Sequence, residues 1–283
     1  MEQASPKRPG IFTLAVASWR SALGAVLTML PLYAAVTAAL FGLDYVFPIL
    51  ETKLAVIRPG RTDLLTLMQV PGAWLFALEK LALGLAVAPA ALATMRHVLV
   101  QEGWRLSPGP MLRFWGWTAM LLVLALAALC VAGLTVTPDV SLIGIVLKAF
   151  AFLLPILLLW VFPAVAEDEP AAGSAARLDK ALERWDGNFW RTVIVLAMTG
   201  IPGVLLMRLP AAIIMRRPGA EADAVAKFDA TIIGSAVHAA FIVLVMVIGA
   251  SAVAWCYSSA KLYRVRRDPL GGTHDAPEPA AKT

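Results

Sequence analysis

The chain has 283 residues, of which 60% are hydrophobic and only 15% are charged. Soluble domains carry roughly a quarter charged residues, so this composition excludes an ordinary soluble domain and favours a membrane protein. The net charge of +5 does not indicate a nucleic-acid partner, because the basic residues lie in short loops and tails beside apolar runs, where they set membrane topology. Both cysteines, Cys130 and Cys256, lie inside apolar runs, which excludes a disulfide framework and a cysteine metal site.

Six apolar stretches are candidate membrane spans. The hydrocarbon core is about 30 Å thick, so a helix needs about 20 apolar residues to cross it. One stretch reaches that length only by including Glu79 and Lys80, which we place near an interface where the lysine can extend towards water. The predicted spans are Ala22–Leu43, Leu75–Met95, Trp115–Val136, Ser141–Val165, Thr192–Ile214 and Thr231–Tyr257.

These spans predict an all-α fold, a polytopic helical membrane bundle of six transmembrane helices. Residues 1–21 form a cytoplasmic N-tail and interfacial segment, residues 22–260 the transmembrane domain, and residues 261–283 a disordered, basic and polar cytoplasmic C-tail. Lysines and arginines are more frequent in the two tails and in the loops after the second and fourth spans than in the other loops. Because positive charge accumulates on the cytoplasmic side, both termini are expected in the cytoplasm.

A short pattern recurs before the first and fifth spans. WRSALGAVLTMLP (residues 19–31) and WRTVIVLAMTGIP (residues 190–202) share Trp, Arg, Thr and Pro at the same offsets. Trp19, Arg20, Trp190 and Arg191 are predicted interfacial anchors, and each proline permits a kink deeper in the span. Two interpretations stay open. The chain contains three repeated helical hairpins with short amphipathic interfacial helices, or the pattern is the one that any span beginning with basic and aromatic residues would show.

The loop before the fifth span contains ALERWDGNFWRT, residues 181–192. Leu178, Leu182, Trp185 and Phe189 are spaced by four, three and four residues, which is typical of one helical face. Glycine at position 187 can end this helix, and Asn188 can cap the next one. We therefore predict a surface helix, with Trp185 and Asn188 among the interfacial anchors.

FPAVAEDEPAAGSAARLDKALERWDGNFWRTVIVL (residues 162–196) resembles the central signature of a bacterial family of six-span proteins. That family includes the membrane domain of some glycerophosphoryl diester phosphodiesterases and many stand-alone proteins of unknown function. The matching positions include Pro163, Glu167, Asn188 and Arg191, and the insertion at residues 168–176 departs from the pattern. The resemblance implies an inner-membrane, multi-pass architecture and carries no catalytic residues, since the motifs of the soluble phosphodiesterase domain do not occur here.

Four ionisable residues form the candidate intramembrane polar site: Glu79, Lys80, Lys148 and His238. An ionisable group within a span is a functional candidate by default. The ordinary alternatives are a lysine that extends to the interface and a neutral histidine bonded to a neighbouring helix. No hydrolase, metalloprotease, phosphate-binding or Cys-x-x-Cys motif appears, so neither an enzyme nor a cofactor or metal site is expected.

Two functions remain. The first is an integral cytoplasmic-membrane protein with a structural or regulatory role, whose partners are the lipid bilayer and either another membrane protein or a second copy of itself. The second is a transporter or permease for a lipid-like or amphipathic small molecule, which a shared cavity around Glu79, Lys148 and His238 would favour.

Overall fold

The computed structural model describes residues 9–53, 73–101, 108–134, 159–167, 188–215 and 232–267. Within these ranges the chain is helical and contains no strand, which confirms the all-α prediction. The helices are α1 (Ile11–Thr28), α2 (Leu30–Lys53), α4 (Ala73–Leu99), α5 (Pro108–Leu134), α7 (Val161–Ala166), α9 (Phe189–Met215) and α11 (Ile232–Arg267).

Five of the described helices are long and apolar enough to cross a membrane. They contain the candidate spans Ile11–Thr28, Leu30–Phe47, Leu78–Leu99, Phe189–Leu206 and Ile232–Leu262. Four of the six predicted spans therefore fall on such helices, and the first of them is divided between α1 and α2. Most of the predicted span 141–165 lies outside the described residues.

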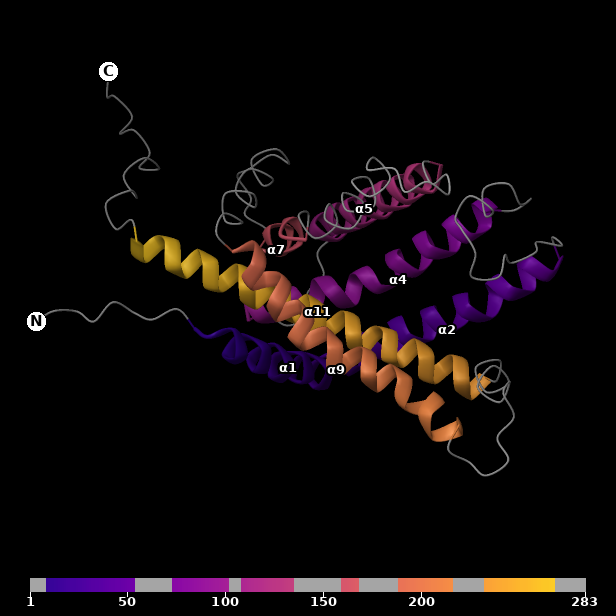
Figure 1. The fold of residues 1–283 in the computed structure, drawn as a ribbon, viewed down its shortest axis with the longest axis horizontal. Coiled ribbons are helices and arrows are strands. Elements are labelled where there is room, and N and C mark those ends of the chain that lie inside the picture. The colour runs from indigo at the N-terminus through magenta and orange to yellow at the C-terminus, as the bar shows by residue number, and fades with distance from the viewer. Residues whose placement is uncertain are drawn as a thin grey trace, which may run out of the picture.

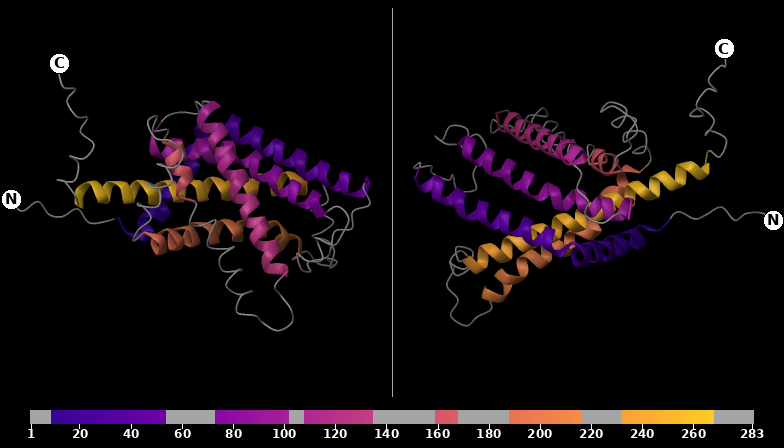
Figure 2. Two further views of the ribbon diagram at one scale, coloured as in Figure 1. Left: turned by 90° about the horizontal axis from the view of Figure 1, so that it is seen from above. Right: turned by 180° about the vertical axis from the view of Figure 1, so that it is seen from behind.

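Helix α11 is the central element of the bundle. It packs against α1, α2, α4 and α9, and α4 in turn packs against α2, α5 and α7. Figures 1 and 2 show the start of α1 and the end of α11 at the same end of the molecule, where α4 also ends and α5 and α9 begin. We call this the basic end, because Arg96, Arg113, Arg191 and Lys261 lie on these helix ends.

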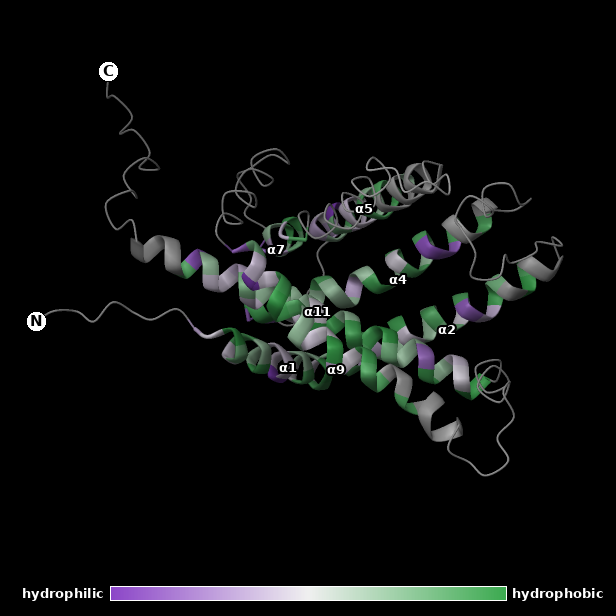
Figure 3. Cartoon of the chain, in the orientation of Figure 1, coloured by the Kyte–Doolittle hydropathy of each residue, from purple (hydrophilic) through white to green (hydrophobic). Residues whose placement is uncertain are grey.

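Helix α11 has 36 residues, which corresponds to about 54 Å at 1.5 Å per residue. This exceeds the hydrocarbon thickness of about 30 Å, so the helix extends beyond any bilayer that it crosses. Its last turns include residues 261–267, which the sequence analysis assigns to the C-tail. The middle part of α11 is mainly hydrophobic (Figure 3).

The predicted kink at Pro31 is a complete break between two helices. Met29 has φ −120° and ψ 30°, and the chain resumes as α2 at Leu30. Proline favours the break because it lacks an N–H and its ring crowds the preceding turn. Figure 1 shows α2 continuing away from α1 at an angle instead of folding back along it.

Proline alone does not explain this break, because Pro202, at the matching offset, lies inside the continuous helix α9. The difference lies in what holds the chain on either side of Met29. Ser251 donates to the Ser18 carbonyl at 3.0 Å and fastens α1 to α11, whereas Tyr33 and Thr94 share a 2.7 Å hydrogen bond that fastens α2 to α4. The two copies of the pattern, residues 19–31 and 190–202, therefore have different local structures.

Two buried clusters form the core. One joins α1, α4, α5, α7, α9 and α11 near the basic end, and the other joins α1, α2, α4 and α11. Small residues let helices approach closely, as is common in membranes. A Cβ placed at Gly84 would lie 2.4 Å from Leu122 of α5, and one at Gly203 would lie 3.1 Å from Val245 of α11.

Candidate functional site: a polar cluster at the basic end and an apolar cavity beside it

The best-developed group of polar contacts surrounds Glu167, the residue that follows α7. Lys261 Nζ of α11 donates to both carboxylate oxygens of Glu167, at 2.9 and 3.0 Å, and the Tyr257 hydroxyl lies 3.5 Å from Oε2. The Glu167 side chain is only 12% exposed, and that of Lys261 is 41% exposed. We call Glu167, Lys261, Tyr257 and Arg96 the Glu167 cluster.

Arg96 connects a third helix to this cluster. It lies in the last turn of α4, and its Nη1 donates to the Ala166 carbonyl at 3.3 Å. The last carbonyls of a helix lack partners within the helix, and a basic side chain near them also interacts favourably with the helix dipole. Arg96 thus binds the carbonyl end of α7, and the cluster joins α4, α7 and α11.

Aromatic rings support the cluster from the apolar side. Trp160, almost fully buried, packs edge-on against Tyr257 with ring centroids 5.7 Å apart. Phe162 and Phe114 lie 4.8 Å apart and link α7 to α5. Because these rings fix α7 in place, the Glu167 carboxylate is held at a defined position near the end of the bundle.

The predicted intramembrane polar residues do not gather at one site in the described part of the chain. Glu79 is 8% exposed and forms a 3.1 Å ion pair with its neighbour Lys80. His238 is exposed on α11, and the starts of α4 and α11 diverge in Figures 1 and 2. Lys148 lies outside the described residues.

Of the predicted interfacial anchors, Trp190 and Arg191 lie at the start of α9, at the basic end, whereas Trp19 and Arg20 lie in the middle of α1. Trp19 packs against the core of α1, α2, α4 and α11, whereas Arg20 and Trp190 are exposed. Asn188 is buried and precedes α9, and its carbonyl accepts the Thr192 N–H at 2.9 Å. Arg191 Nη2 donates to the Pro9 carbonyl. Trp185 lies outside the described residues.

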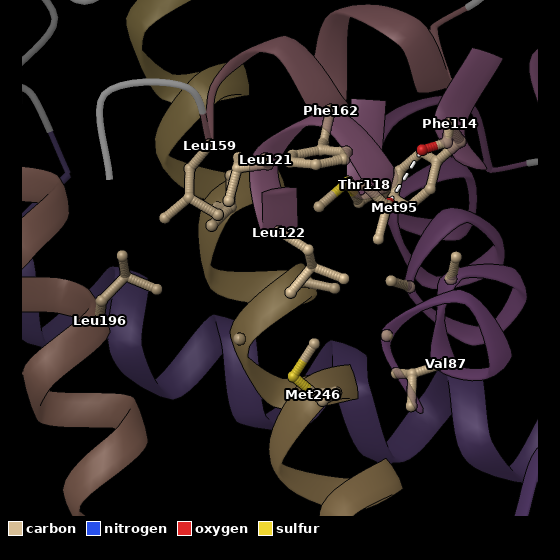
Figure 4. A pocket seen from close by; sticks show the side chains of 16 residues that line it. Val87, Met95, Phe114, Thr118, Leu121, Leu122, Leu159, Phe162, Leu196 and Met246 are labelled. Carbon is tan, nitrogen blue, oxygen red and sulfur yellow. Dashed lines mark hydrogen bonds between the residues drawn. The ribbon is translucent and has the colours of Figure 1, made fainter. Parts of the chain in front are cut away.

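A cavity of about 320 Å³ lies beside the cluster, between α4, α5, α7, α9 and α11 (Figure 4). Its described lining consists of carbon-rich side chains and glycines, with Thr118 as the one hydroxyl residue. Neither Glu79 nor His238 belongs to this lining. Within the described ranges, His, Cys, Asp and Glu form no group of three that could hold a metal ion.

Sequence reasoning recognised Glu167 only as a signature position and missed its partners. Lys261 is 94 positions further along the chain and appeared to belong to a polar tail. The only sequence signal was the acidic residue itself at the end of an apolar run. Comparisons of the chain with protein-family models, curated proteins and solved structures find no match.

Proposed function

We propose that this chain is a non-enzymatic integral protein of the cytoplasmic membrane that organises or regulates other membrane components. The observation that carries this proposal is the Glu167 cluster, which fixes three helices at the basic end, while Glu79 and His238 lie on helix ends that diverge. A fixed polar surface at one end is better suited to binding a partner membrane protein or a second copy of this chain than to forming a path for a transported molecule.

In the proposed topology the basic end and both termini face the cytoplasm. Arg96, Arg113, Arg191 and Lys261 all lie at this end, in keeping with the enrichment of positive charge on the cytoplasmic side. Helices α1 and α2 then form a single bent crossing, since α2 leads away from α1. With α5 and the apolar stretch 141–165 as further crossings, the chain has six spans.

We further propose membership of the family of six-span proteins that residues 162–196 resemble. The burial of Asn188 and the interhelical contacts of Glu167 support this, because both residues belong to the matching pattern. That pattern then has a structural purpose, which is to join the end of the fourth span to the sixth.

A deletion strain provides the functional test. We expect unchanged uptake of small molecules but an altered abundance or assembly of other membrane proteins, measured by quantitative proteomics and native gels of isolated membranes. Complementation with the wild-type chain should reverse the effect. A specific loss of uptake or export with unchanged membrane-protein assembly would contradict the proposal.

The alternative is a transporter or permease for a lipid-like molecule. The apolar cavity favours it, because an amphipathic substrate needs an apolar surface next to a polar one. Comparative lipidomics of the same deletion strain separates the two functions: a transporter predicts a changed abundance of one lipid class, whereas a structural protein does not.

A further inference from the structure

We propose that the cavity between α4, α5, α7, α9 and α11 holds one acyl chain of an anionic phospholipid of the cytoplasmic leaflet, with the phosphate bound by arginines at the basic end. The inference depends on the proposed topology, since it needs the basic end to lie at the level of the lipid phosphates. It goes beyond the proposed function by naming a ligand, its class and its orientation.

The lining of the cavity fits a hydrocarbon chain. Figure 4 shows Leu121, Leu122, Leu159 and Met246 around the space, with Phe162 at its upper side. The Thr118 hydroxyl donates to the Phe114 carbonyl at 2.8 Å, a bond within α5. The one hydroxyl of the described lining therefore already has its acceptor, and the site offers a ligand contacts with apolar surface.

The extent of the cavity matches one leaflet. Along α4 the lining runs from Gly84 to Met95, which at 1.5 Å per residue is about 16 Å. Half of a hydrocarbon core of about 30 Å has nearly the same depth. A volume of about 320 Å³ is at the small end of ligand pockets, which start at about 300 Å³, so the cavity suits a single chain.

Two arginines are next to lining residues in the chain at the basic end. Met95 and Phe114 line the cavity, and the adjacent residues in the chain are Arg96 and Arg113. Arginine binds phosphate with several parallel N–H donors, and basic pockets between spans bind anionic headgroups. The nearby Glu167 carboxylate is neutralised by Lys261 and so does not repel the phosphate.

Glycine 249 gives a direct way to fill the cavity. It lines the space, and a Cβ added there meets no atom within 4 Å. Gly200 on α9 has the same free space and the same half-buried setting but is not part of the lining. Gly249→Leu is therefore the test variant, and Gly200→Leu is the matched control.

The experiment is native mass spectrometry with lipid extraction of the full chain purified in mild detergent. We expect wild type and Gly200→Leu to retain about one phospholipid, enriched in the anionic class over the bulk membrane, and Gly249→Leu to retain about tenfold less. Arg113→Gln should keep a bound lipid but lose the preference for the anionic class, whereas Arg20→Gln, away from the lining, should not.

Any one of four results would overturn the inference, and the first three are wild type without bound lipid, retained lipid with the composition of the bulk membrane, and equal retention by Gly249→Leu. A disulfide between a cysteine at position 249 and one introduced within residues 141–158 would also overturn it, because this chain itself would then fill the cavity. Reporter fusions test the topology separately, so a failure of lipid binding and a failure of the proposed topology give different results.

Discussion

At the scale of single residues, Glu167 is the best-defined polar group near the end of the bundle. It accepts two hydrogen bonds from Lys261 and lies next to the carbonyl that Arg96 binds. A partly buried carboxylate requires such partners, because removing a charge from water is costly unless it is paired and hydrogen-bonded. The residues that compensate the buried charge of Glu167 therefore also connect the helices.

Lys261→Met should lower stability by about 1 kcal/mol, a modest value because Lys261 is 41% exposed and solvent weakens the pair. The measurement is the midpoint of denaturant-induced unfolding in detergent micelles. Lys80→Met is the control, since its ion pair with Glu79 joins adjacent residues of one helix. An equal loss of stability in the two variants would show that the ion pair between α7 and α11 contributes no more to stability than a pair within one helix.

At the scale of elements, the paired prolines show how tertiary contacts modify a local signal. Pro31 and Pro202 follow a Trp-Arg pair at the same distance, and a threonine three residues earlier bonds back to its own helix in both cases. Nevertheless α9 is continuous, while the first helix breaks at Met29. The bonds to α11 on one side and to α4 on the other hold the two segments in different directions.

Pro31→Ala should therefore leave the bend largely in place. Spin labels at positions 20 and 45, both exposed, would be about 38 Å apart in one straight helix, and we expect a clearly shorter distance in wild type and variant alike. Pulsed electron paramagnetic resonance measures it. Labels at exposed positions 194 and 205 of the continuous helix α9 provide a straight-helix reference. A rise to the straight-helix distance in Pro31→Ala would mean that proline alone causes the break.

The close approach of α4 and α5 depends on Gly84. A Cβ there would lie 2.4 Å from Leu122, so Gly84→Val should destabilise the fold by about 1–3 kcal/mol, the usual cost of overpacking. Adding Leu122→Ala should restore part of this loss, as a double-mutant cycle in thermal unfolding would show. Gly116→Val, where a Cβ meets nothing within 4 Å, is the control; an equal effect there would show that the loss does not come from the contact with Leu122.

At the scale of the whole molecule, the distribution of charge and the order of the helices both agree with the proposed topology. The start of α1 and the end of α11 lie at one end (Figure 1), together with the basic side chains of the helix ends. In the proposed topology of six crossings, both termini lie on one side, and the positive-inside tendency makes that side the cytoplasm.

Reporter fusions after Glu169 and after Ala222 test this topology. We expect a cytoplasmic reporter to be active at the first position and a periplasmic reporter at the second. The reason is the excess of lysine and arginine in the tails and in the loops on the same side. A periplasmic signal after Glu169 would reverse the orientation and would remove the basis for a phosphate at the basic end.

The sequence by itself determined the helical class, the approximate position of most apolar helices and the location of basic residues near their ends. These properties follow from composition and from the length of apolar runs, which depend on neighbouring residues alone. The sequence alone also predicts the start of α9 immediately after Asn188. In the pair Gly-Asn, glycine favours the end of one helix and asparagine favours the beginning of the next.

The tertiary structure alone decided which residues meet. The contact of Glu167 with Lys261 spans 94 positions, and the bond between Tyr33 and Thr94 spans 61, so no local pattern contains them. The same holds for the break at Met29 and for the cavity between five helices, because both result from the packing of segments far apart in the chain. Charges chosen for their position within a span, such as Glu79 and His238, lie on diverging helix ends, since sequence gives depth in the membrane but not the neighbour that a side chain faces.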